Sequence, residues 1–323
     1  EVYNMSKKLD EMSDMEHPIY YNFRDEEAKK YWDGENFGVT SNFKKLKRVL
    51  LHRPGEEVNV VKGNEKHWRW RGEIDAEVLK EDWDRLKNTF EEEGVQVDLL
   101  QDFYPDKPYL YFMRDQAVVT PAGAIISRMA LTERKGEEHP VMKKLVNLDI
   151  PIIYTVHGFG TFEGGNFMFI DDETAVVGES IKTNPEGIRQ IRNVLEIQGI
   201  EVLEVSVPSH FKTSGGYGHI DGLLSILDED LAAVFPEGLP YKFLEYLADK
   251  GFDLIELPRD ERGHLGANLL PIAPRKAIAV EGNEKIKKLL EDHDVEVIEV
   301  EMEELIKGGG GPRCSTLELL REG

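Results

Sequence analysis

Apolar residues recur along this chain with two alternating spacings. Leu79, Trp83, Leu86 and Phe90 are separated by three or four positions, which predicts the buried face of a helix. Gly94 then ends the helix, and the apolar run that follows it predicts a strand. The same succession of helical stripe, Gly or Asp, and strand returns at 141–156, 188–205, 243–257 and 285–300. The chain is therefore predicted to contain an internal repeat of about 50 residues.

Pairs of short apolar segments lie between these units. Each pair is separated by a turn rich in Pro, Gly or Asp, which predicts a hairpin. The predicted turns are at 121–123, 171–173, 228–230 and 274–276. The repeating unit is thus expected to be strand–strand–helix–strand, present five times.

The fifth copy is divided between the two ends of the sequence. Its first strand is STLELL, at 315–320, after which the sequence stops. We expect KRVLLHRPG, at 47–55, to supply the missing partner strand, because this pairing would close a ring and remove exposed strand edges.

Polar residues suited to catalysis occupy one position in this repeat, just before the first strand of each hairpin. If the five units surround a pseudo-fivefold axis, equivalent positions converge on that axis. Residues far apart in sequence would then share one pocket. The residues at this position are Asp115, Glu163, His219 with Asp221, Asn268 and Cys314.

Charge and composition narrow the choice of partners. The 323 residues carry a net charge of −22, spread along the chain, which disfavours nucleic acid or an anionic membrane as the main partner. A cationic substrate and simple solubility are both compatible with this charge. No apolar stretch approaches the roughly 20 residues that span a bilayer, and the first residues lack a secretory signal. A cytoplasmic protein is therefore expected.

Cys314 is the single cysteine, so neither an intrachain disulfide nor a multi-cysteine zinc site is expected. It follows four glycines at 308–311, which permit positive φ angles and close approach to a ligand. The alternatives for this segment are a flexible loop and a small buried hydrophobe. No His cluster with ligand spacing indicates a metal site.

The other candidates suit acid–base chemistry and cation binding. His219 and Asp221 are two positions apart, so both can face one pocket, and an imidazole beside Cys314 can hold it as thiolate. Glu163 can orient that imidazole and raise its basicity. Asp115 and Asp221, here called the carboxylate pair, can bind a planar cation such as guanidinium. Alternatively, Asp115 pairs only with the neighbouring Arg114.

On these residues the sequence resembles the guanidino-modifying superfamily, which includes arginine deiminases, dimethylarginine hydrolases and arginine amidinotransferases. Arginine deiminase is the closest match. The resemblance implies a five-bladed α/β propeller of ββαβ units with pseudo-fivefold symmetry. The matching segments run in order from Lys47 to Cys314: KRVLLHRPGEE, FMRD, EGGN, GES-x-KTN, GHID, GANL-x-x-IAP and GGGGPRC.

The resemblance also implies the roles of the residues. Cys314 would be the nucleophile, His219 the general acid and base, and Glu163 its orienting carboxylate, with the carboxylate pair binding the guanidinium. The implied reaction is hydrolysis of arginine or a related guanidino compound through a covalent amidino-cysteine, releasing ammonia and a ureido product. It needs no cofactor.

Several positions depart from the family pattern. Lys182 stands where deiminases carry an Arg that binds the substrate carboxylate, and Asn166 replaces an Asp. Arg128 and Arg313 are further cations that could bind the carboxylate. Asn268 matches a family Asn, with a substrate role or a loop-bracing role.

Three classes of function remain open. The first is a deiminase, and the second is an amidinotransferase or an arginine dihydrolase, which would use the same residues. The third is a binding module, because some five-bladed relatives have no chemistry.

We expect residues 43–323 to form one catalytic domain and residues 1–42 an N-terminal extension that packs on it or covers the pocket. A small guanidino compound is the expected partner. A homo-oligomer is compatible with the sequence, which does not define the oligomeric state.

Overall fold

The computed structural model describes residues 32, 35–101, 104–208 and 218–322. Most of the predicted N-terminal extension, residues 1–31 with 33–34, lies outside the described residues. Among the helices of the described part, none combines the length and the apolar run that crossing a membrane requires.

The described residues form five mixed sheets of three strands each. In each sheet two antiparallel strands are followed by a strand parallel to the middle one. A helix forms each parallel crossover, as a parallel connection requires. This confirms the predicted strand–strand–helix–strand unit and the α/β class.

Four of the sheets follow the order of the chain. Their elements are β3 (Ala117–Thr120), β4 (Gly123–Ile126), α5 (Glu138–Asn147) and β5 (Ile152–Thr155); β6 (Phe167–Asp171), β7 (Thr174–Glu179), α6 (Pro185–Glu196) and β8 (Glu201–Ser206); β9 (Leu224–Asp228), β10 (Leu231–Val234), α7 (Tyr241–Asp249) and β11 (Asp253–Glu256); and β12 (Leu270–Ala273), β13 (Lys276–Val280), α8 (Glu284–Glu291) and β14 (Glu296–Val300).

The fifth sheet joins distant parts of the sequence. β15 (Leu317–Arg321) pairs antiparallel with β1 (Leu46–His52), which in turn pairs parallel with β2 (Gln96–Leu100). The short helix α3 (Glu65–Trp68) and the crossover helix α4 (Ala76–Glu92) lie between β1 and β2 in sequence. The predicted pairing of the last strand with the segment near residue 50 is therefore confirmed.

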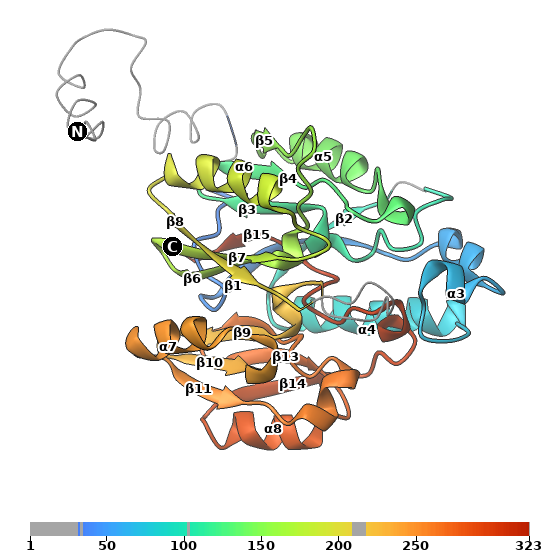
Figure 1. Ribbon diagram of the computed structural model, residues 1–323. Helices are drawn as coiled ribbons and strands as arrows, with labels where there is room; N and C mark the ends of the chain where they lie inside the picture. Colours follow the sequence, from blue (N-terminus) through green and yellow to red (C-terminus); the bar gives the residue numbers. More distant parts are fainter. Residues whose placement is uncertain (1–31, 33–34, 102–103, 209–217, 323) are drawn as a thin grey trace, which may run out of the picture.

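The crossover helices bury one apolar face each. In α4 the side chain of Asp75 caps the first turn, and the predicted stripe from Leu79 to Phe90 is buried. Gly94 follows with φ +73°, which a glycine adopts without steric cost. In Figure 1, α5 and α6 lie at one end of the molecule and α7 and α8 at the other, with strands between them.

The core extends beyond the predicted domain boundary at residue 43. Phe37 and Val39 are buried in the same apolar cluster as residues of β3, β4 and β15. Gly38 donates a backbone hydrogen bond to Leu319 of β15, 2.8 Å long. Phe37 and Val39 thus pack on the sheets of the domain, which is one of the two arrangements expected for the segment before residue 43.

Candidate active site

A pocket of about 230 Å³ lies where the segments that precede the first strands of the sheets meet. Four of the five segments line it directly. Glu163, on the fifth, is fully buried and reaches the pocket through His219. The predicted residues that line the pocket are Asp115, His219, Asp221, Asn268 and Cys314.

Short 3-10 turns form part of three of these segments: η3 (Met113–Asp115), η5 (Gly164–Asn166) and η6 (Ile220–Gly222). The turns pack so closely that glycine is required at Gly165. A Cβ atom there would lie 2.6 Å from Nδ1 of His219 and 2.8 Å from Oδ1 of Asp115. The EGG sequence therefore allows the imidazole and the carboxylates to approach one another.

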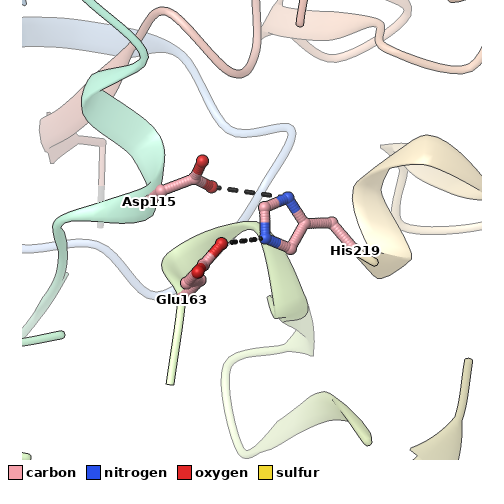
Figure 2. A group of neighbouring side chains, drawn as sticks. All are labelled: Asp115, Glu163 and His219. Carbon is pink, nitrogen blue, oxygen red and sulfur yellow. Dashed lines mark hydrogen bonds and ion pairs between the residues drawn. The ribbon is translucent and has the colours of Figure 1, made fainter. Parts of the chain in front are cut away.

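His219 lies between two carboxylates (Figure 2). Its Nε2 is 2.8 Å from Oε2 of Glu163, and its Nδ1 is 3.5 Å from Oδ1 of Asp115. Since both ring nitrogens face carboxylate oxygens, only the doubly protonated ring can donate toward both. A protonated ring in this position could donate toward both carboxylates and act as a general acid.

These three residues also form a potential metal-ligand set. Asp115, Glu163 and His219 each offer one ligand atom, and the three atoms lie within 4.8 Å of one another. Two cations stand beside them: Arg134 Nη1 is 2.5 Å from Oδ2 of Asp115, and Lys182 Nζ is 3.6 Å from Oε2 of Glu163. Their charges oppose a metal ion, so the cluster fits an imidazolium better.

Cys314 is nearly buried, and Nδ2 of Asn268 donates to its Sγ at 3.0 Å. Burial raises the pKa of the Cys314 thiol, and the charges of Asp221 and Asp115 raise it further. The hydrogen bonds from Gly311 and Asn268 act in the opposite direction without offsetting this. This environment opposes ionisation of the Cys314 thiol, and a thiolate held by His219 stays a prediction.

The carboxylate pair has two buried oxygen atoms without a hydrogen bond. Oδ1 of Asp115 and Oδ2 of Asp221 accept none from any described residue. Burial raises the pKa of Asp221, although the charge of His219 opposes this shift. At Asp115, burial acts in the same direction, but the charges of His219 and Arg134 outweigh it and lower the pKa. Oδ1 of Asp115 has only the 3.5 Å ion pair with Nδ1 of His219. Buried carboxylate oxygens without a hydrogen bond are costly, and a bound cation would satisfy them.

Arg134 belongs to the site but was not identified from the sequence. It is buried, lines the pocket, and pairs with Asp115 and with Glu137 at 2.8 Å. The predicted alternative partner of Asp115, Arg114, instead contacts Glu318 and the carbonyl of Phe167. Nothing distinguishes Arg134 in the sequence from exposed arginines of other polar loops.

Two of the predicted amides brace the loops of the site. Asn166 is buried, donating to the carbonyl of Gly218 at 2.7 Å and accepting from the backbone of Ile220, so it holds the segment that carries His219. Asn268 accepts from the backbone amides of Gly311, Arg313 and Cys314, at 3.1 to 3.3 Å, and so holds the loop of the cysteine.

The predicted cations divide between the pocket and its surroundings. Lys182 lines the pocket, whereas Arg128 and Arg313 do not. Arg128 donates to the carbonyl of Gly160 at 3.1 Å. Arg313 is fully buried and donates to Oδ1 of Asn42 at 2.9 Å, so it has no access to a ligand in the pocket. Arg69, Arg71 and Arg262, which the sequence analysis did not single out, line the pocket as well.

Comparison with known proteins adds the family context. Residues 58–321 match the model of the eukaryotic N,N dimethylarginine dimethylhydrolases. The Bacillus subtilis protein YkgA is 31% identical over 280 residues, covering 85% of this chain and 92% of its own length. An arginine deiminase of Bacillus cytotoxicus is 26% identical over 70% of this chain, which spans 66% of the deiminase.

Two solved structures share the fold. One is a dimethylarginine dimethylaminohydrolase from Pseudomonas aeruginosa, complexed with citrulline, with a TM-score of 0.72 and 21% sequence identity. The match covers 85% of this chain and 100% of the chain of that enzyme. The other is the N-terminal domain of a cyanobacterial arginine dihydrolase, ArgZ, bound to substrate, with a TM-score of 0.73 and 19% sequence identity. The match covers 85% of this chain and 98% of the ArgZ domain.

Proposed function

Since this chain belongs to the N,N-dimethylarginine dimethylhydrolase family of guanidino-modifying enzymes, close to arginine deiminase, we propose that it hydrolyses the guanidinium of arginine or a closely related compound. The structural relatives crystallised with citrulline or with the substrate of an arginine dihydrolase support this choice of substrate class.

One observation carries the proposal. The carboxylate pair presents two buried oxygen atoms that accept no hydrogen bond, in the pocket that also holds Cys314 and His219. A guanidinium is planar, permanently charged and rich in N–H donors, so it can pair with both carboxylates. Binding it there would bring its central carbon to the nucleophile.

The free thiol is inactive until a substrate is bound. Asp221 and Asp115 raise the pKa of Cys314, and a bound guanidinium would neutralise both charges. The pKa of the thiol then falls, its proton leaves to solvent, and the thiolate attacks the guanidinium carbon. The imidazolium of His219 protonates the departing amine, leaving an amidino group on Sγ.

Water completes the reaction. His219, now neutral, accepts a proton from a water molecule, and the resulting hydroxide attacks the amidino carbon. The C–S bond breaks, Sγ leaves as thiolate, and a ureido product is released. Glu163 keeps Nε2 of His219 oriented throughout, and its pKa is lowered by Lys182 and His219 despite burial, so it stays ionised.

We also interpret the five sheets as the blades of a propeller around a pseudo-fivefold axis. The repeated topology, the pairing of β1 with β15 and the shared pocket at equivalent positions support this arrangement. In such a fold each blade brings its own residues to the site, which explains the assembly of the site from distant segments.

Product analysis with mass spectrometry tests the proposal. L-arginine and dimethylarginine are incubated with the protein, and citrulline, ammonia and dimethylamine are quantified. Protein quenched during turnover is expected to carry an amidino adduct on Cys314, and Cys314→Ser is expected to bind substrate without turnover. Ornithine as product would indicate the dihydrolase alternative, and a requirement for an added amine the amidinotransferase. A fully active Cys314→Ser protein would exclude the covalent mechanism.

A further inference from the structure

Three buried arginines take no part in the proposed reaction. Arg114 lies in η3, Arg313 in the cysteine loop, and Arg321 at the end of β15. Each is at most 4% exposed, and none of them lines the substrate pocket. Together with Glu318, on the same strand as Arg321, they are here called the arginine cluster. Buried charges are costly unless they are paired, so the partners of this cluster matter.

Two kinds of contact bring the members of the arginine cluster together. The backbone amide of Arg114 donates to the carbonyl of Cys314 at 3.0 Å, so η3 lies beside the residue that follows Arg313. Glu318 joins the other two arginines. Its Oε2 is 2.5 Å from Nε of Arg321, and its Oε1 is 3.5 Å from Nη1 of Arg114.

Arg114 and Arg313 also reach the same strand. Nη2 of Arg114 donates to the carbonyl of Phe167 in β6 at 2.7 Å. Asn42 accepts from Nη2 of Arg313 at 2.9 Å and donates in turn to the carbonyl of Phe169. Residues two apart on a strand are separated by about 7 Å, so both guanidinium groups lie near the start of β6.

Several donors in this region have no acceptor among the described residues. Nε and Nη1 of Arg313 and Nε of Arg114 are buried without a hydrogen bond, and so is Oγ of Ser315. Within the described part of the chain Arg313 forms no ion pair, and Glu318 is the carboxylate that pairs with the other two arginines. Three guanidinium groups thus share one paired carboxylate, and donors remain free.

The electrostatics agree with this deficit of negative charge. Burial lowers the pKa of Arg313 to about 10, and the charge of Arg114 lowers it further, although Glu318 and Asp221 oppose the shift. Asp221 acts on Arg313 by its charge without forming an ion pair with it. A water molecule can accept from the free N–H groups, but it leaves the positive charge in place. A small anion satisfies the donors and offsets the charge.

We propose that the arginine cluster binds a chloride ion at Nε and Nη1 of Arg313 and Nε of Arg114. The site is distinct from the substrate pocket, because none of its residues lines that pocket. Since its donors are buried, the ligand is enclosed by the protein, which favours a monatomic anion over a carboxylate or a phosphate ester. The ion stabilises the folded protein and takes no part in turnover.

Bromide is the crystallographic probe, because it replaces chloride and its anomalous scattering distinguishes it from water. Crystals of the full chain grown in sodium bromide are expected to show an anomalous peak in contact with Nε of Arg313 and Nε of Arg114. Crystals of Arg313→Met grown in the same way should lack this peak. Ordered water without anomalous signal at these atoms in the wild type would overturn the proposal.

Thermal unfolding gives a second readout in solution. Chloride is titrated against isethionate, which is too large for a buried site, at constant ionic strength. An ion that binds the folded state alone raises Tm with its concentration, here by at least about 2 °C, and Arg313→Met should remove this rise. Arg189→Met is the matched control and should keep it, because Arg189 is exposed and pairs with Glu186 in α6.

A Tm of the wild type that follows ionic strength alone would contradict chloride binding, as would an equal response of the wild type and Arg313→Met. If Arg313→Met does not fold, the bromide experiment on the wild type decides the proposal without it.

Discussion

At the scale of single residues, the negative charges of Asp115 and Asp221 oppose ionisation of the Cys314 thiol, which the proposed reaction requires. Burial raises the pKa of Cys314, and the charges of Asp221 and Asp115 raise it further. The same carboxylates are the groups that we propose to bind a guanidinium. Under the proposed mechanism, activation of the nucleophile is therefore coupled to binding of the cation.

This coupling predicts opposite effects of one substitution. Asp221→Asn removes a negative charge beside Cys314, so the pKa of the thiol falls and iodoacetamide should alkylate it several-fold faster at neutral pH. Turnover of a guanidino substrate should fall instead, by about 3–5 kcal/mol in kcat/KM, because half of the cation site is lost.

Mass spectrometry measures the rate at which Cys314 is alkylated, and steady-state kinetics measures the turnover of the guanidino substrate. Asp84→Asn is the control, because Asp84 is exposed and pairs with Arg53 away from the pocket. Slower alkylation of Asp221→Asn would mean that Asp221 does not act on the thiol.

The residues predicted from the sequence and those missed differ in one physical respect. Cys314, His219, Glu163 and the carboxylate pair stand at equivalent positions of a repeat, so their periodicity makes them visible. Arg134 and Arg71 come from irregular connections of the chain, where only the folded loop brings the side chain to the pocket. Arg128 and Arg313 were chosen by charge alone, which does not indicate where a side chain points.

At the scale of elements, the site depends on loops that amide side chains hold together. Asn268 precedes β12 and accepts three backbone N–H groups of the cysteine loop, which precedes β15. Asn268→Ala leaves these buried donors unpaired, so we expect a loss of about 1–3 kcal/mol in the free energy of unfolding and a lower kcat.

Urea unfolding followed by circular dichroism measures this loss. Asn59→Ala serves as control, since the Asn59 amide donates only to Glu56 at the surface. Equal free energies of unfolding for the wild type and Asn268→Ala would contradict the claim that the Asn268 amide stabilises the cysteine loop.

A second element contact makes stability depend on pH. Glu57, in the connection that follows β1, is buried beside His52, whose Nδ1 is 2.8 Å from the carbonyl of Leu100. Burial opposes ionisation of Glu57, but hydrogen bonds from His52 and Gly55 outweigh it and lower its pKa. A carboxylate with a depressed pKa stabilises the fold fully above its unfolded pKa of about 4.5, and this contribution is lost as pH falls.

Glu57→Gln should therefore be less stable than the wild type at pH 7, by about 1.5–3 kcal/mol, with the difference shrinking below pH 4. Free energies of unfolding measured between pH 3 and 7 decide this. A difference that stays constant over that range would show that the charge of Glu57 contributes nothing.

At the scale of the whole molecule, the fold depends on pairing its two ends. The hydrophobic spacing predicted the repeating unit and the partner of the last strand, because both follow from period and edge pairing. The hydrophobic spacing did not predict that Phe37 and Val39 join the core, because two apolar residues among polar neighbours show no helical or strand periodicity. Their burial depends on β15, which lies nearly 300 residues away in sequence.

The role of this closure can be measured in β15 itself. Leu319 is fully buried in the core that contains Phe37, whereas its neighbour Leu320 is only partly buried. Leu319→Ala removes buried methyl groups at the junction of the two ends, so we expect the free energy of unfolding to fall by about 2–5 kcal/mol. Leu320→Ala, the matched control in the same strand, should lose clearly less, because its side chain faces away from that core. Urea unfolding of both variants gives the comparison, and similar losses would mean that β15 is held by its strand pairing rather than by its packing.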